Sequence, residues 1–363
     1  MKLNELKTPA IILDLDALEN NIKNFHNMAK DNDKEIWPMI KTHKSSEIMK
    51  MQKDAGATGV LCGNLGECER AAELGFSNVM YAYPVTDKLA IDRIIKLSKK
   101  TNFIIRLDDI RQAELIEKEI KDDTKINYTL IINCGLNRFG VKKEDALKTI
   151  EAINKLSCFV FKGISSHPGH VYSAKSGDEL PKYVEDEISS LKYVKDELLK
   201  NNIKCEIVSS GSTPTFPYAV KSDVINIFHP GNYVYLDSIQ ISLGIAKESD
   251  CALRVLASVI SNPEEDKFLI DAGSKCLALD KGAHGNDSIV GHGKIIGHSS
   301  SIVDSLSEEV GKLKSNDLKL GERIEIIPNH SCSTANSTSY LYGFRGDEVE
   351  RIIEVDIREN SIK

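Results

Sequence analysis

The sequence lacks several features that mark whole classes of protein. Its eight cysteines include no Cys-x-x-Cys pair and no spacing typical of a disulfide framework, which favours reduced thiols in the cytoplasm. It contains neither a signal peptide nor an apolar segment long enough to span a bilayer, so we expect a cytoplasmic protein with no membrane partner. The formal net charge of −7 argues against a nucleic-acid partner and favours a small-molecule ligand.

The composition is that of a folded protein with a large core. Hydrophobic residues make up 41% and charged residues 28% of the 363-residue chain. This length suits an α/β barrel of about 250 residues joined to a smaller domain. We therefore expect two domains.

Short apolar runs alternate with helical stretches through the first two thirds of the chain. After a first strand at residues 10–15, eight runs follow, at residues 35–41, 59–63, 78–83, 103–107, 128–133, 161–166, 205–210 and 224–228. Each run is too short to distinguish a strand from a helix, so the regular alternation carries the argument. It predicts a (β/α)8 barrel over residues 10–235.

The pattern changes after about Gly231. Short β-branched segments follow at residues 252–260, 267–270, 288–297 and 323–327, separated by Gly, Asp and Asn turns and without long helices. Residues 280–287 are predicted to form a long surface loop. We expect residues 236–363, together with residues 1–9, to form a β-rich domain.

Lys41 is the first candidate for chemistry. An apolar run leads into it and a helix-forming stretch follows, which predicts a position where a strand gives way to a helix at the barrel rim. Partial desolvation there would disfavour the ammonium form and leave an amine able to condense with an aldehyde. A surface lysine at a strand end is the alternative.

A second candidate is the loop after the seventh barrel strand. Gly211 permits close backbone approach, and Ser212 and Thr213 add hydroxyl groups that can hold a phosphate. Barrels frequently bind phosphate with the loops after strands seven and eight. The alternative is an ordinary turn capped by Ser and Thr.

Three further loops at the same face carry polar side chains. Arg138 follows the fifth strand, where a guanidinium can bind an oxyanion, although a loop arginine is more often solvated. His170 and Tyr172 follow the sixth strand and can face a ligand or belong to a structural turn. Tyr233 follows the eighth strand.

His330 and Cys332 form a candidate metal site. On an extended chain, residues i and i+2 point the same way, so both could bind one ion. Two ligands with open positions suit a catalytic divalent ion, and a thiolate favours zinc over manganese. The alternative is a buried cysteine beside a packed histidine.

The segments at residues 38–45, 133–140, 209–215, 230–233 and 330–332 resemble the D-threonine aldolase and D-serine dehydratase family, fold-type III enzymes with an alanine-racemase-like barrel. The resemblance implies that Lys41 is the Schiff-base lysine for pyridoxal phosphate. Gly211, Ser212 and Thr213 would bind its phosphate, and His330 and Cys332 would bind the metal. Arg138 and Tyr233 would also belong to the site. The implied protein is a homodimeric lyase acting on D-3-hydroxy amino acids.

The chain departs from the family pattern at three places. Trp37 stands where the family has Arg, Met39 where it has His, and Val310 where it often has His. Dehydration and retro-aldol cleavage therefore both stay open. Two other functions are alternatives: an amino-acid racemase, which would have no use for His330 and Cys332, and a non-catalytic pyridoxal-phosphate-binding protein, whose short relatives generally lack a β domain.

Overall fold

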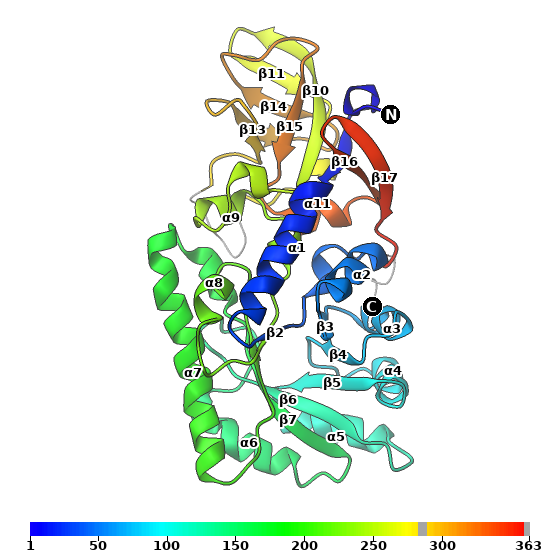
Figure 1. The fold of residues 1–363 in the computed structure, drawn as a ribbon, viewed down its shortest axis with the longest axis vertical. Coiled ribbons are helices and arrows are strands. Elements are labelled where there is room, and N and C mark those ends of the chain that lie inside the picture. Colours follow the sequence, from blue (N-terminus) through cyan, green and yellow to red (C-terminus); the bar gives the residue numbers. More distant parts are fainter. Residues whose placement is uncertain (282–288, 359–363) are drawn as a thin grey trace.

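The computed structural model describes residues 1–281 and 289–358, so most of the loop predicted at residues 280–287 lies outside the described residues. The chain forms a barrel and a strand-rich domain stacked along the long axis of the molecule (Figure 1). None of the described helices is long and apolar enough to cross a bilayer.

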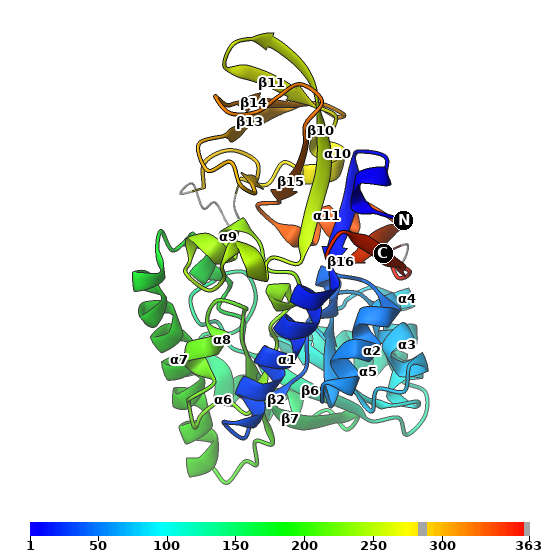
Figure 2. The ribbon, with the colours of Figure 1, turned by 45° about the horizontal axis from the view of Figure 1, so that its top comes forward.

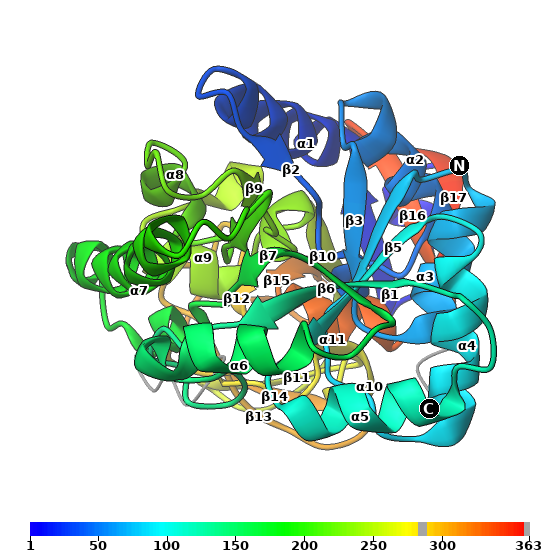
Figure 3. The same cartoon turned by 90° about the horizontal axis from the view of Figure 1, so that it is seen from below.

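The predicted barrel is confirmed. Eight parallel strands run in the order β2-β9-β8-β7-β6-β5-β4-β3, and a bridge between Met39 and Leu61 brings the two ends of this sheet together. Figure 3 looks along the barrel. The strands are β2 (Glu35–Ile36), β3 (Gly59–Cys62), β4 (Asn78–Tyr81), β5 (Asn102–Leu107), β6 (Ile126–Ile131), β7 (Phe159–Ser165), β8 (Ile207–Ser210) and β9 (Ile227–Phe228).

Helices cover the outside of the barrel. They are α1 (Leu15–Lys30), α2 (Ser46–Asp54), α3 (Leu65–Glu73), α4 (Lys88–Ser98), α5 (Ile110–Glu119), α6 (Ala146–Ile153), α7 (Leu180–Lys200) and α8 (Phe216–Ala219). Several begin at a side-chain cap, as where Asp14 accepts the amide of Ala17 and Asn64 accepts that of Glu67. Such caps satisfy backbone donors that a helix start leaves unpaired.

Apolar side chains fill the interior of the barrel up to its mouth. They form a separate cluster of Trp37, Leu61, Met80, Ala82, Ile104, Ile207 and Ile227. Gly59 makes room for the indole of Trp37, because a Cβ at this position would lie 2.8 Å from two of its ring carbons. These side chains close the barrel interior below the carboxyl ends of the strands, where barrel enzymes bind their ligands.

The second sheet includes the first strand of the chain. β1 (Ala10–Asp14) pairs antiparallel with β10 (Leu253–Glu264) and parallel with β16 (Tyr340–Arg345), so residues 10–14 belong to this sheet and not to the barrel. Buried apolar side chains around β1 form a cluster of Leu6, Ala10, Ile12, Leu256 and Phe344. An apolar run predicts a strand, but it does not say which partner the strand has.

The remaining strands of this sheet are β11 (Lys267–Ile270), β12 (Lys294–Ile295), β13 (Ile302–Leu306), β14 (Gly311–Lys314), β15 (Arg323–Ile327) and β17 (Glu348–Glu354). Two predicted segments, 267–270 and 323–327, coincide with β11 and β15. Of the segment predicted at 288–297, the described residues 289–297 form a strand only at the two residues of β12. The described helices of this part are short: α9 (Ser238–Ser242), α10 (Ser274–Leu277) and α11 (Ser331–Asn336).

Helix α11 joins the two parts of the molecule. It lies against the 3-10 turn Ile40–Thr42, over the barrel mouth (Figure 2). The amide of Asn336 donates hydrogen bonds to the backbone oxygens of Lys41 (3.3 Å) and Thr42 (3.1 Å) and to that of Cys332 (2.8 Å) within α11. Side chains of the second domain are thereby placed beside the residues that follow β2.

Candidate active site

A cavity of about 450 Å³ opens at the barrel mouth between the loops that follow the strands and helix α11. Its size is within the usual range for a small-molecule site. Of the predicted residues, Lys41, Arg138, Tyr172, Gly211, Ser212, Thr213, His330 and Cys332 line it. His170 and Tyr233 do not.

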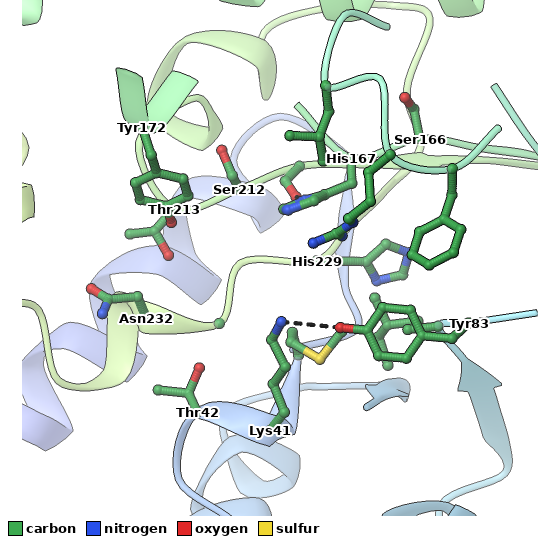
Figure 4. Close-up of a pocket in the computed structure, with 18 of the residues that line it drawn as sticks. Lys41, Thr42, Tyr83, Ser166, His167, Tyr172, Ser212, Thr213, His229 and Asn232 are labelled. Atoms are coloured by element: carbon green, nitrogen blue, oxygen red, sulfur yellow. Dashed lines mark hydrogen bonds between the residues drawn. The ribbon is translucent and has the colours of Figure 1, made fainter. Parts of the chain in front are cut away.

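Lys41 extends into this cavity from the 3-10 turn that follows β2 (Figure 4). Its Nζ donates to the hydroxyl group of Tyr83 at 3.2 Å. The predicted position between strand and helix is correct, but the side chain is exposed at the barrel mouth, so the expected desolvation by the chain is absent. Burial tends to raise the pKa of Tyr83, and the positive charges of Lys41 and Arg138 outweigh this effect and lower it.

Apart from the His330–Cys332 pair, the charged side chains that line this cavity in the described part of the chain are cations: Lys41, Arg106 and Arg138. Arg106, on β5, is buried and donates through Nη2 to the backbone oxygen of Ser166 (3.0 Å), while its Nε has no partner among the described residues. Burial lowers the pKa of Arg106 to about 10. A cavity lined by cations without carboxylates suits a ligand with several negative charges.

The loop after β8 forms one wall. Gly211 has a φ of +120°, a conformation that favours glycine. Ser212 and Thr213 are buried against the cavity, and the hydroxyl group of Tyr172, from the loop after β7, lies beside that of Thr213. Figure 4 shows Ser212, Thr213 and Tyr172 together across the cavity from Lys41. The predicted phosphate loop therefore faces the predicted lysine.

Two histidines of the cavity were missed by the sequence analysis. His167 lies beside Gly211, with its Nδ1 3.2 Å from the backbone oxygen, and the Nδ1 of His229 lies 2.8 Å from the backbone oxygen of Trp37. Burial lowers the pKa of His167 well below its ordinary value and that of His229 to about 3, so both rings are neutral. Their position directly after β7 and β9 was the signal that could have identified them.

His170 and Tyr233 lie elsewhere. The ring of His170 packs against Tyr183 with centroids 5.1 Å apart, and its Nε2 is 3.6 Å from a carboxylate oxygen of Asp186. The hydroxyl group of Tyr233 is buried behind the barrel mouth, 3.2 Å from the Nε2 of His26, and accepts a hydrogen bond from Gln52 at 3.0 Å. Because Gly169–Ser173 forms a 3-10 turn, the backbone directs Tyr172 toward the cavity and His170 away from it.

His330 and Cys332 do meet, although not on an extended chain. Helix α11 begins at Ser331, so Cys332 is in its first turn and His330 is the N-cap residue. The two side chains lie close enough to influence each other's ionisation. Burial opposes both charges, but their mutual attraction raises the pKa of His330 and lowers that of Cys332. An Asp237 carboxylate oxygen lies 3.6 Å from the His330 Nδ1.

The three departures from the family pattern have different positions. Met39 lines the cavity, whereas Trp37 is buried in the barrel floor and donates through Nε1 to Thr58 at 2.8 Å. Val310, between β13 and β14, does not line the cavity. Met39 is thus the only one of the three whose side chain can contact a ligand there.

Comparison with known protein families agrees with this geometry. The family model for the N-terminal domain of alanine racemase matches residues 13–239, which is more than half of the chain. The chain belongs to the alanine racemase N-terminal domain family. The model of a putative serine dehydratase domain matches residues 252–344. The two matches fall on the barrel and on the strand-rich domain.

Curated relatives align over nearly the whole chain. The 3-hydroxy-D-aspartate aldolase of Paracoccus denitrificans (strain Pd 1222) is 28% identical, covering 99% of this chain and 94% of its own. The D-serine dehydratase of Dictyostelium discoideum is 29% identical and covers 95% of each chain. Both names are those of lyases, and the chain is an enzyme of this class.

Solved structures show the same fold. The D-threonine aldolase from Filomicrobium marinum superposes with a TM-score of 0.86 at 27% identity, over 97% of this chain and 95% of its own. A metal-free form of a D-threo-3-hydroxyaspartate dehydratase has a TM-score of 0.88 at 24% identity and covers 98% of both chains. The alanine-racemase-like fold predicted from the sequence is confirmed.

Proposed function

We propose that this protein is a pyridoxal-phosphate- and metal-dependent lyase that acts on D-3-hydroxy amino acids. The observation that carries the proposal is the meeting, in one cavity, of Lys41, the loop 211–213 and the His330–Cys332 pair. The lysine and the loop come from the barrel and the pair comes from the second domain. An amino-acid racemase would require the lysine and the loop but not the His330–Cys332 pair.

The residues of the cavity fit the cofactor. Pyridoxal phosphate carries an anionic phosphate and a phenolate oxygen, and the described cavity is lined by three cations, Lys41, Arg106 and Arg138, and by no carboxylate. When bound, the cofactor supplies an electron sink for bonds broken at the substrate's α-carbon. Ser212 and Thr213 would hold the phosphate, Arg138 would donate to the phenolate oxygen, and the amine of Lys41 would attach to the aldehyde.

Tyr83 is the residue placed to move a proton at Lys41. Its hydroxyl group already accepts a hydrogen bond from Nζ at 3.2 Å, and its pKa is lowered by Lys41 and Arg138 despite burial. A phenol with a lowered pKa can take and return a proton more readily at neutral pH. His167 and His229 are neutral and serve to fix the loop backbone at Gly211 and Trp37.

The donor set also fits a metal ion. His330 and Cys332 supply an imidazole nitrogen and a sulfur, for which zinc is the first choice and manganese the second. Within the described residues no group of three metal-binding side chains occurs. At catalytic metal sites a remaining position is open to water or substrate. When bound, the ion supplies a Lewis acid that polarises the substrate's hydroxyl group. Asp237, with a carboxylate oxygen 3.6 Å from the His330 Nδ1, would orient the imidazole ring, as carboxylates commonly do at metal sites.

Substrate assays test the proposal. D-Serine, D-threonine and D-3-hydroxyaspartate are supplied in turn, with and without EDTA, and the products are identified. Dehydration of D-serine releases pyruvate and ammonia, whereas retro-aldol cleavage releases an aldehyde or glyoxylate together with glycine. We expect one of these activities and its loss with EDTA. Racemisation of amino acids without lyase products would contradict the proposal.

A further inference from the structure

A buried carboxyl group lies behind the loop that follows β8. Glu187 is on α7, and its side chain is fully buried at 0% exposure. The hydroxyl groups of Ser210 and Thr215 lie beside the carboxyl group. Neither carboxyl oxygen completes a well-formed hydrogen bond with the described residues. An acid in this position has no part in the chemistry assigned above.

Among the described residues, no positive charge is placed to stabilise the ionised form of Glu187. In the described chain it forms no ion pair, and the titratable group that faces it from a neighbouring element is the thiol of Cys134, after β6. On its own helix, Asp186 turns to His170 instead. Burial raises the pKa of Glu187 to about 7, and the hydroxyl groups of Ser210 and Thr215 offset part of this effect.

The loop between Glu187 and the cavity has two faces. Ser212 and Thr213 line the cavity, while Ser210 and Thr215 lie beside the carboxyl group. The two faces are joined by a contact of 3.3 Å between the hydroxyl oxygens of Ser212 and Thr215. A change of charge at Glu187 therefore acts on the side chains that would hold a phosphate.

We propose that Glu187 is a positioning residue that couples a protonation step to the binding of the cofactor's phosphate group. The inference rests on the proposed function, because it requires a phosphate on the loop 211–213. In the protonated form the carboxyl group is neutral and donates to a hydroxyl group of Ser210 or Thr215, which fixes the loop. In the ionised form it places a negative charge behind the loop and repels the phosphate.

The sign of the pH dependence follows from linkage. A bound phosphate disfavours ionisation of the nearby carboxyl group, so its pKa is higher in the complex than in the free protein. Phosphate binding is therefore strongest below pH 7. It weakens as the pH rises through the pKa of the free protein and becomes constant above the pKa of the complex.

Pyridoxal phosphate and pyridoxal are the probes that isolate this effect, because they share the ring and the aldehyde and differ in the phosphate. The Kd of each is measured by absorbance from pH 6 to pH 9 with the full-length protein freed of cofactor. We expect the preference for pyridoxal phosphate over pyridoxal to fall by about fivefold or more in the wild type. Glu187→Gln should lack this fall, while Glu185→Gln, an exposed change on the same helix, should retain it.

The outcomes separate the two proposals. The phosphate's own titration, with a pKa near 6, is common to all variants and cancels between them. The same pH dependence of the phosphate preference in wild type and Glu187→Gln would overturn the role of Glu187. A Kd for pyridoxal phosphate that is higher in Glu187→Gln than in the wild type by the same factor at every pH would overturn it as well. Failure of the wild type to bind pyridoxal phosphate would instead contradict the proposed function.

A second variant keeps the test available if Glu187→Gln does not fold. Thr215→Val preserves the shape of the side chain and removes one hydroxyl group beside the carboxyl group. We expect the fall in phosphate preference to move to higher pH, because the variant loses a hydroxyl group that stabilises the ionised carboxyl group and the pKa of Glu187 rises further. A fall over the same pH range as in the wild type would contradict the coupling.

Discussion

The amine of Lys41 shares one cavity with a phenol and two guanidinium groups, whereas the next lysine along the chain has a different environment. Lys44 is buried and forms an ion pair with Glu67, so its amine is not available to an aldehyde. This contrast between two lysines three residues apart allows a sharp test of which one holds the cofactor.

Lys41→Arg should abolish covalent attachment of the cofactor, because a guanidinium stays protonated and is not an amine nucleophile. Borohydride treatment of the wild type should fix the cofactor to the peptide that contains Lys41, as seen by mass spectrometry and by absorbance. Lys50→Arg, an exposed change on α2, is the control and should behave as the wild type. A label on Lys44 would contradict the assignment.

Tyr83→Phe should lower kcat by about 100-fold, since it removes the hydroxyl group placed to exchange a proton with Lys41. Attachment of the cofactor and its absorbance should persist, because the amine itself is unchanged. The measurement compares steady-state kinetics with the cofactor spectrum. Equal losses of cofactor and activity would show that the phenol has only a structural role.

Cys332→Ala should keep the cofactor's absorbance and lose most lyase activity, because Lys41, Arg138 and the loop 211–213 are untouched while one metal ligand is removed. EDTA should produce the same loss reversibly in the wild type, and metal analysis should show less bound ion in the variant. Cys276→Ala, on α10 and away from the cavity, is the control. Full activity in metal-free protein would favour the racemase alternative.

At the scale of elements, the sequence predicted the barrel well because its strands and helices alternate locally. The same local pattern does not predict which distant segments contact each other. The pattern at residues 10–15 indicated a strand but not its pairing with β10 and β16, and the spacing of His330 and Cys332 indicated a pair but not the helix that begins between them. The sequence pattern predicts His170 in the site and not His167. A 3-10 turn, and not the strand period, sets which side chain after β7 faces the cavity.

Helix α11 is the element whose attachment can be tested by one side chain. Asn336→Ala removes the hydrogen bonds to the backbone of Lys41, Thr42 and Cys332 and should lower the free energy of unfolding by about 1 to 3 kcal/mol. It should also raise KM, since α11 carries the metal pair. Ser337→Ala, which removes a hydrogen bond made only within the segment, is the control for denaturation and kinetics. A smaller effect than the control would contradict the joining role of α11.

At the scale of the whole molecule, the family resemblance predicts a head-to-tail homodimer in which the second domain of one subunit closes the barrel mouth of the other. Large apolar side chains on the hairpin β16–β17, such as Ile352 at 53% exposure, suit a surface that a partner covers. Small-angle scattering and sedimentation should give twice the mass of the chain. A monomer with full activity would contradict this prediction.

The pairing of β1 also has a consequence for how the chain acquires its structure. Both partners of this early strand come more than two hundred residues later, as in the register of Ala10 with Leu256 and of Ile12 with Tyr342. During synthesis the barrel segments therefore leave the ribosome with the first strand still unpaired. Contacts of such long range close slowly, because a large loop must be ordered before they form. Completion of the second sheet is thus expected to be the late step of folding, and α11 can reach the barrel mouth only when nearly the whole chain has been made.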